Sequence, residues 1–114
     1  MDYVKSFLSK ELTVTIDRPL GSTHPEYRKM VYPVNYGYIE GTKAPDGEEV
    51  DAYVLGVGDP IERFKGICVA VIHRRNDKDD KLVVIPKGEK YTIEKIKELV
   101  NFQEKYFDSD IISG

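Results

Sequence analysis

The order of the secondary-structure patterns constrains the fold of this chain most strongly, because several strand patterns follow one another before the helix pattern begins. Alternating or apolar runs cover residues 12–16, 29–39, 50–55, 65–72 and 81–85, and Gly, Pro or charged turn residues bound them. No helical stretch separates successive strands, which argues against a sheet of strand-helix-strand units. We therefore expect a mainly β fold with α (α+β), built as a small, twisted, partly closed barrel of five strands.

One amphipathic helix follows the strands. Thr92 is a suitable N-cap for a helix that runs to about Tyr106. Its stripe at helical spacing consists of Ile96, Leu99, Val100, Gln103 and Phe107. We expect this helix to pack on the sheet. A weaker helical pattern at residues 3–8 predicts a short turn or helix ahead of the first strand.

Composition narrows the class of protein. The chain has 114 residues, which favours a single domain over residues 1–114. Its net charge of −3, with acids and bases interspersed, argues against a nucleic-acid partner. No apolar window approaches the roughly 20 residues that span a bilayer, and no signal-peptide pattern opens the sequence. The single cysteine, Cys68, lies in an apolar run and predicts a buried, inert thiol. We expect a cytoplasmic protein without a membrane partner.

An acidic turn is the first candidate site. Asp46, Glu48 and Asp51 lie within six positions, and carboxylates in one pocket repel each other unless cations neutralise them. Tyr36, ten positions ahead of Asp46, supplies a phenol that could meet an anion held by such metals. Taken alone, Pro-Asp-Gly is more often an ordinary solvated turn. An EF-hand is excluded, because Asp51 stands where that loop requires glycine.

The two segments together resemble a known family. YPVNYGY at residues 32–38 and DGEEVD at residues 46–51 are similar to the signature of soluble (family I) inorganic pyrophosphatases, with the same interval between them. One difference is that the middle acid is Glu48 where the family usually has Asp. The resemblance identifies a short, divergent member. It implies an OB-like barrel and Mg²⁺-dependent hydrolysis of inorganic pyrophosphate to two phosphates by metal-activated water, with Mn²⁺ as an alternative ion.

The resemblance also implies the roles of individual residues. A second acidic loop, NDKDDK at residues 76–81, is similar to the family's second metal loop, although taken alone it is a solvated hairpin tip. Asp77 is favoured over Asn76 as its first ligand, because a carboxylate suits a hard cation better. The implied metal ligands are Asp46, Asp51, Asp77 and Asp79. Glu48 is implied as the catalytic base, and the implied substrate-binding residues are Tyr36, Lys81 and Tyr106.

Other positions depart from the family pattern. Phe107 stands where the family has a lysine, and the hairpin between the first strand and residue 32 is largely absent. Arg18, His24 and Arg28 are the cations available there, and spacing alone does not say which one contacts phosphate. Two alternatives to a pyrophosphatase therefore stay open: a non-catalytic or weakly catalytic phosphate-compound binding module, and a hydrolase of a larger diphosphate. An edge strand and exposed tyrosines would also allow a homo-oligomer.

Overall fold

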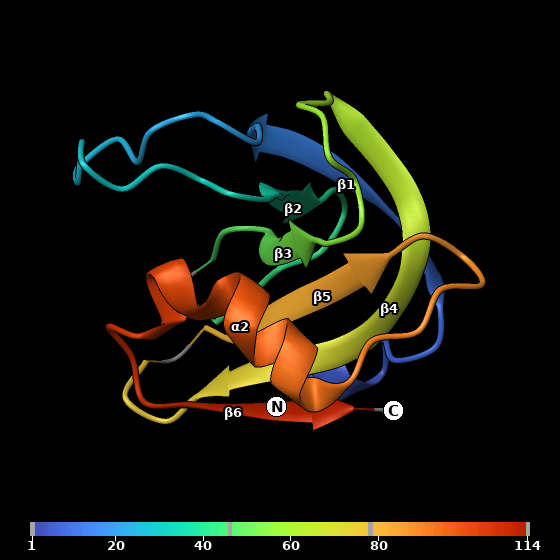
Figure 1. The fold of residues 1–114 in the computed structure, drawn as a ribbon. Coiled ribbons are helices and arrows are strands. Elements are labelled where there is room, and N and C mark those ends of the chain that lie inside the picture. Colours follow the sequence, from blue (N-terminus) through green and yellow to red (C-terminus); the bar gives the residue numbers. More distant parts are fainter. Residues whose placement is uncertain (1, 46, 78, 114) are drawn as a thin grey trace.

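The structure is a computed structural model that describes residues 2–45, 47–77 and 79–113 (Figure 1). Two helices and six strands occur in these ranges. In chain order they are α1 (Asp2–Lys5), β1 (Glu11–Arg18), β2 (Asn35–Ile39), β3 (Val50–Val54), β4 (Arg63–Arg74), β5 (Lys81–Ile85), α2 (Ile93–Glu104) and β6 (Ser109–Ser113).

Five of the strands close into a barrel. Neighbours follow the order β1-β2-β3-β5-β4, and β1 also pairs with β4, which completes the ring. Only the β3–β5 pair is parallel. The long strand β4 curves around the barrel, pairing with β1 along Arg63–Ile67 and with β6 along Ala70–Arg74 (Figure 1). The predicted OB-like, five-stranded barrel is confirmed, and β6 is an addition that the sequence did not predict.

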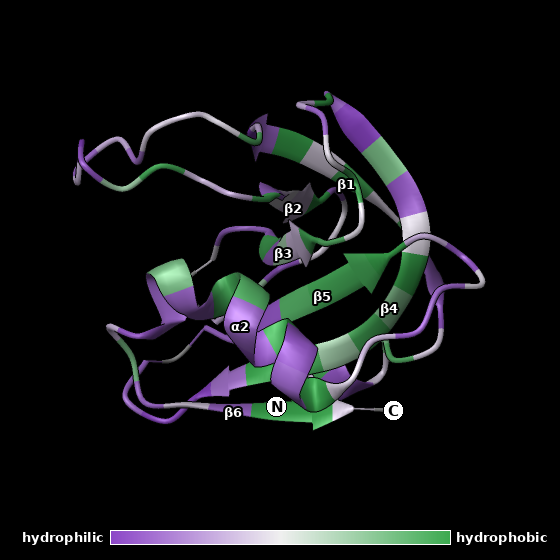
Figure 2. Cartoon of the chain, in the orientation of Figure 1, coloured by the Kyte–Doolittle hydropathy of each residue, from purple (hydrophilic) through white to green (hydrophobic). Residues whose placement is uncertain are grey.

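Strands β3 and β5 are buried on both faces, so the chain has two apolar cores. Figure 2 shows that β5 is hydrophobic over most of its length. Alternate side chains point to opposite faces of a strand. The core inside the barrel includes Ala52, Val54, Leu82 and Val84. The core between the outer face of the barrel and α2 includes Tyr53, Leu55, Val83, Ile85, Ile96 and Val100.

Helix α2 confirms the predicted helix, although it ends at Glu104 instead of running to Tyr106. The Thr92 hydroxyl accepts a hydrogen bond of 3.1 Å from the backbone N–H of Lys95, which caps the first turn. Residues 105–107 form a turn that leads to β6, so Phe107 lies beyond the helix. Within the described residues, no helix is both long and apolar enough to cross a membrane.

The strand predicted at residues 29–39 begins only at Asn35. Residues 19–34 form a loop whose two arms meet at a single β-bridge between Thr23 and Val31. Pro33 lacks the backbone N–H that a longer ladder would need, which explains the late start of β2. Within β2, Gly37 lies so close to β1 that an added Cβ would stand 1.9 Å from the Thr15 carbonyl oxygen. Glycine at this position therefore permits the barrel to close.

Candidate active site

A cleft of about 910 Å³ lies on the outer face of the barrel, between the 19–34 loop and the C-terminal end of α2. Both segments project from the same side of the barrel (Figure 1). Among the described lining residues Asp51 is the one acid, whereas six are basic: Arg18, Arg28, Lys29, Arg74, Lys81 and Lys105. Concentrated positive charge in a concave site favours an anionic ligand.

Asp51 holds two of the predicted substrate-binding groups. Its Oδ2 accepts hydrogen bonds from the Tyr36 hydroxyl at 2.9 Å and from the Lys81 ammonium at 2.8 Å. The strand register explains the meeting with Lys81, because Ala52 on β3 lies beside Leu82 on β5 and the preceding residues lie side by side. Burial, reinforced by Asp51, raises the pKa of Tyr36 well above its ordinary value. Tyr36 therefore remains a hydrogen-bond donor at neutral pH.

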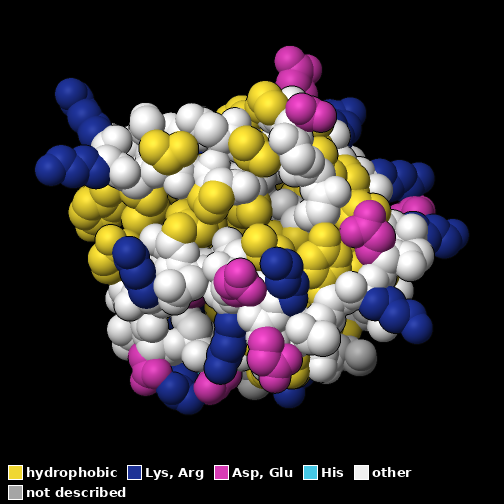
Figure 3. All heavy atoms as spheres, in the orientation of Figure 1, with side chains coloured by type: hydrophobic (Ala, Val, Ile, Leu, Met, Phe, Trp, Pro, Cys, Tyr) yellow, Lys and Arg dark blue, Asp and Glu magenta, His cyan; other side chains and the backbone are white. Residues whose placement is uncertain are grey.

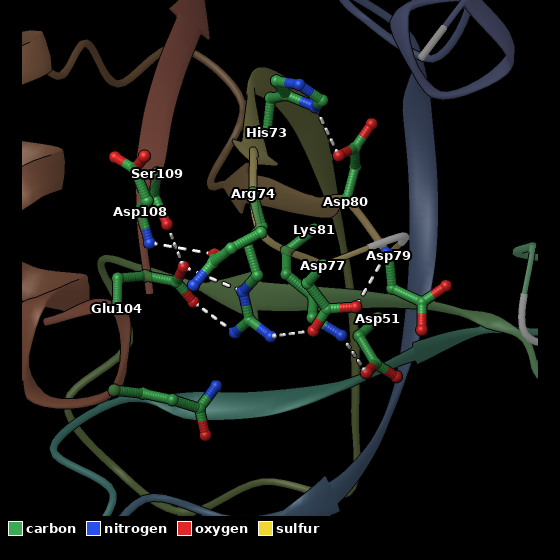
Figure 4. A network of polar contacts seen from close by, with 12 residues as sticks. Asp51, His73, Arg74, Asp77, Asp79, Asp80, Lys81, Glu104, Asp108 and Ser109 are labelled. Atoms are coloured by element: carbon green, nitrogen blue, oxygen red, sulfur yellow. Dashed lines mark hydrogen bonds and ion pairs between the residues drawn. The ribbon is translucent and has the colours of Figure 1, made fainter. Parts of the chain in front are cut away.

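The second acidic loop, residues 76–81, brings Asp77 and Asp79 next to the pair formed by Asp51 and Lys81 (Figure 4). An Asp77 carboxylate oxygen accepts a 3.2 Å hydrogen bond from the backbone N–H of Asp79, and Asp77 also lies 3.5 Å from the Arg74 guanidinium. Asn76 turns away, because its side-chain oxygen accepts a hydrogen bond from the backbone N–H of Asp108. On the other side of this loop, His73 pairs with Asp80 at 2.8 Å.

A buried ion pair stands behind the cleft. Arg74 is 5% exposed and donates two hydrogen bonds to the Glu104 carboxylate, at 3.0 and 2.5 Å. The same carboxylate accepts from Tyr53 at 2.6 Å and from Ser109 at 2.7 Å. Burial by itself would raise the pKa of Glu104, but these donors outweigh it and hold the pKa below its ordinary value. The Phe107 ring, centred 3.7 Å from the guanidinium carbon, covers Arg74.

Further hydrogen bonds extend this pair to the opposite wall of the cleft. Gln103 donates to the Tyr53 hydroxyl at 2.7 Å and accepts from the Tyr32 hydroxyl at 2.9 Å. Tyr32 in turn accepts from Arg18 at 2.9 Å. A bulge in β1 between Ile16 and Arg18 interrupts the alternation, which places Arg18 on the cleft side although Ile16 faces the barrel interior.

We call this set the floor network: Arg18, Tyr32, Gln103, Tyr53, Glu104 and Arg74. Sequence reasoning missed it. The available signal was the pair of polar residues Gln103 and Glu104 on the inner face of a helix that otherwise buries apolar side chains. Buried polar groups require partners, so this pair predicts a polar network beneath the helix.

The predicted site residues are only partly brought together. Tyr36, Asp51, Lys81 and Tyr106 line the cleft, as do the three N-terminal residues left without an assigned role, Arg18, His24 and Arg28. Asp77 and Asp79 lie beside Lys81 (Figure 4). Glu48 is exposed in the turn before β3 and is not among the described residues that line the cleft. Asp46 lies outside the described residues.

The donor set has the chemistry of a site for hard cations. Asp51, Asp77 and Asp79 supply carboxylate oxygens, the ligands that Mg²⁺ and Mn²⁺ accept. Among the residues that the structure describes, no three acidic, histidine or cysteine side chains form a group that could hold a metal ion. In the described arrangement, Asp51 is paired with Lys81 and Asp77 faces Arg74. The carboxylate oxygens of these residues are nevertheless suitable ligands for a divalent ion. Asp46 joins them as a candidate ligand from the sequence motif alone.

The fold and the cleft together define a class, the OB-like barrels with a cationic site on the outer face of the sheet. Comparison with known proteins specifies it further: the family model for inorganic pyrophosphatase matches residues 8–110. The chain belongs to the inorganic pyrophosphatase family. Membership implies a divalent metal cofactor.

Individual relatives agree with this assignment. An inorganic pyrophosphatase of Aeropyrum pernix is 37% identical over 67 residues, which cover 54% of this chain and 38% of the relative. That of Sulfolobus acidocaldarius is 34% identical over 83 residues, which cover 68% of this chain and 44% of the relative. This chain thus spans less than half the length of these two curated relatives. The crystal structure of inorganic pyrophosphatase from Ehrlichia chaffeensis has the same fold, with a TM-score of 0.71, 21% identity, and coverage of 93% of this chain and 87% of that one.

Proposed function

We propose that this protein hydrolyses the phosphoanhydride bond of inorganic pyrophosphate. One observation carries the proposal: Lys81 and Tyr36 meet on Asp51 inside a cationic cleft, with Asp77 and Asp79 beside them. Phosphoryl transfer depends mainly on positioning and on neutralising charge, and such a cleft can do both.

The metal site in this proposal consists of Asp46, Asp51, Asp77 and Asp79. The position of Asp77 beside Asp79 supports Asp77 over Asn76 as the ligand. A bound Mg²⁺ would lower the pKa of a coordinated water and neutralise phosphate charge, and Mn²⁺ would serve the same donors.

The remaining roles belong to side chains that donate or accept protons. Lys81 and Tyr36 donate hydrogen bonds to the phosphate groups, and Tyr36 keeps its proton for this purpose because burial raises its pKa. Tyr106, at the rim, contacts the outer phosphate. Glu48 accepts the proton of the attacking water as general base. Since Glu48 lies in the turn next to β3, a rotation of this long side chain has to bring the carboxylate to the cleft.

The test is the Glu48→Gln variant. General-base catalysis contributes roughly 10²–10⁴-fold, so we expect phosphate release from pyrophosphate in Mg²⁺ to fall by at least ~100-fold. Mg²⁺ binding, measured by calorimetry, should persist, because Glu48 is not a proposed ligand. Glu49→Gln changes the neighbouring acid and is the matched control, which should keep its activity. A Glu48→Gln variant with full activity refutes the assignment of the base.

A non-catalytic phosphate-binding module is the second candidate, favoured by the absence of Glu48 from the described residues that line the cleft and by Phe107 in place of the family lysine. The unmodified protein distinguishes the two. Pyrophosphate binding without Mg²⁺-dependent phosphate release would establish the module and refute the hydrolase. A cytoplasmic location and self-association stay predictions from the sequence.

A further inference from the structure

The rim of the cleft carries exposed aromatic and apolar side chains beside the exposed basic residues Arg28, Lys29 and Lys105. Tyr27 and Val31 on the 19–34 loop are 62% and 51% exposed, and Tyr106 after α2 is 64% exposed. All three line the cleft. In Figure 3, lysine and arginine side chains project at the upper left, where this loop lies in Figure 1, above a band of hydrophobic side chains. Inorganic pyrophosphate has no apolar surface and leaves this rim unused.

Tyr27 is held in place by its own loop. Its carbonyl accepts a 2.8 Å hydrogen bond from the backbone N–H of Met30, whose carbonyl accepts one of 2.9 Å from His24. The Tyr27 ring lies 5.0 Å from the His24 ring, which stacks on Tyr32 at 6.2 Å with an interplanar angle of 8°. Nδ1 of His24 accepts hydrogen bonds from the backbone N–H groups of Glu26 and Tyr27, which requires an unprotonated nitrogen there. A tier of aromatic rings therefore leads from the floor network to the rim.

The volume of the cleft also favours a ligand larger than inorganic pyrophosphate. Pockets for drug-sized ligands measure roughly 300–1,000 Å³, and this one, at about 910 Å³, lies near the upper limit. A diphosphate group between Arg18 and Lys81 would fill the floor alone. The remaining volume, which Tyr27 and Tyr106 help to line, leaves room for a second part of the ligand that is flat and apolar, since exposed aromatic side chains favour stacking.

We infer that the cleft binds a diphosphate ester that carries an aromatic ring, the class of a nucleoside 5′-diphosphate, with the phosphates at Lys81 and Arg18 and the ring against Tyr27 and Tyr106. The inference rests on the proposed function in one respect, because both place phosphate on the same cationic floor. It adds the ring as a determinant of affinity. Arg28 and Lys29, on the loop beside Tyr27, add positive charge around the ligand.

The experiment compares two ligands by calorimetry in Mg²⁺. Adenosine 5′-(α,β-methylene)diphosphate carries the ring and resists hydrolysis of its bridge, and the methyl ester of methylenediphosphonate carries the same two phosphorus groups without a ring. We expect the nucleotide to bind at least ~5-fold more tightly, because stacking of one base contributes roughly 5- to 150-fold in affinity. Equal affinity for the two ligands would overturn the inference.

Variants at the rim sharpen the test. Tyr27→Ala should reduce nucleotide affinity roughly 5- to 150-fold, and Tyr27→Phe, which keeps the ring, should restore it. Tyr3→Ala removes another exposed tyrosine, on α1 and outside the cleft, and this variant should bind the nucleotide as the unmodified protein does. Tyrosine-dependent nucleotide binding without pyrophosphate hydrolysis would sustain this inference while refuting the proposed function. Pyrophosphate hydrolysis without a preference for the aromatic ligand would support the proposed function and overturn this inference.

Discussion

Neutralising Glu104 tests whether the buried ion pair behind the cleft stabilises the fold. Glu104→Gln keeps the side-chain size but removes the nearer anionic partner of the Arg74 guanidinium, which is 5% exposed, and leaves, among the described residues, only Asp77 at 3.5 Å. Breaking a buried pair by removing one partner costs about 3–5 kcal/mol. The carboxamide oxygen retains some of the four hydrogen bonds from Arg74, Tyr53 and Ser109, so we expect a loss of ~3 kcal/mol.

Urea unfolding followed by circular dichroism measures this loss. A decrease of ~3 kcal/mol in the free energy of unfolding corresponds to a drop in Tm on the order of 10 °C for a chain of this size. Glu98→Gln on the same helix is the matched control. Its carboxylate is 72% exposed and 3.9 Å from Lys95, and surface pairs of this kind contribute well under ~1 kcal/mol.

Two further measurements test whether the pair of Arg74 and Glu104 contributes to stability. The double variant Arg74→Met/Glu104→Gln removes the stranded charge, so it should be more stable than Glu104→Gln alone. The pKa of Glu104 lies below its ordinary value in the folded protein, so its contribution is present above about pH 4.3 and is lost as the pH falls through the folded pKa. Glu104→Gln should lack this part of the acid destabilisation. A loss below ~1 kcal/mol with an unchanged acid profile would show that the pair contributes nothing to stability.

Two other predictions concern the barrel. Gly37→Ala should destabilise the protein by at least ~2 kcal/mol in urea unfolding, because its Cβ would stand 1.9 Å from the Thr15 carbonyl oxygen, whereas Gly58→Ala meets no atom within 4 Å and is the control. Burial raises the pKa of Cys68 to about 11, so its reaction with a disulfide reagent at pH 8 should be at least ~100-fold slower in the folded protein than in urea, and equal rates would contradict its burial.

Much of the fold could be predicted from local patterns. Alternation and turn residues predict the positions of β1, β3, β4 and β5, and Thr92 predicts the start of α2. Strand β6 could not be predicted, because its five residues, SDIIS, contain only two apolar side chains and depend on pairing with β4. The late start of β2 likewise reflects the bridge between Thr23 and Val31, a contact that periodicity does not report.

The candidate site was predictable where it depends on motif and strand register. Tyr36, Asp51 and Lys81 come from three neighbouring strands and meet in the cleft. The role of Arg18 could not be predicted, because a bulge in β1 decides which face it occupies. The sequence alone also indicated a scarcity of cations around the substrate. In the fold, six of the described basic side chains reach the cleft from distant parts of the chain: Arg18 from β1, Arg28 and Lys29 from the 19–34 loop, Arg74 from β4, Lys81 from β5, and Lys105 from the turn after α2.

The floor network also bears on the entropy of binding. Arg18 and Arg74 already have their guanidinium groups fixed by Tyr32 and Glu104 before a ligand arrives. Immobilising a flexible side chain at a binding site costs about 0.5–1.5 kcal/mol, so two arginines ordered in advance spare an anion ~1–3 kcal/mol. This corresponds to roughly 5- to 150-fold in Kd. Under the proposed function, phosphate would thus meet guanidinium groups that folding has already ordered.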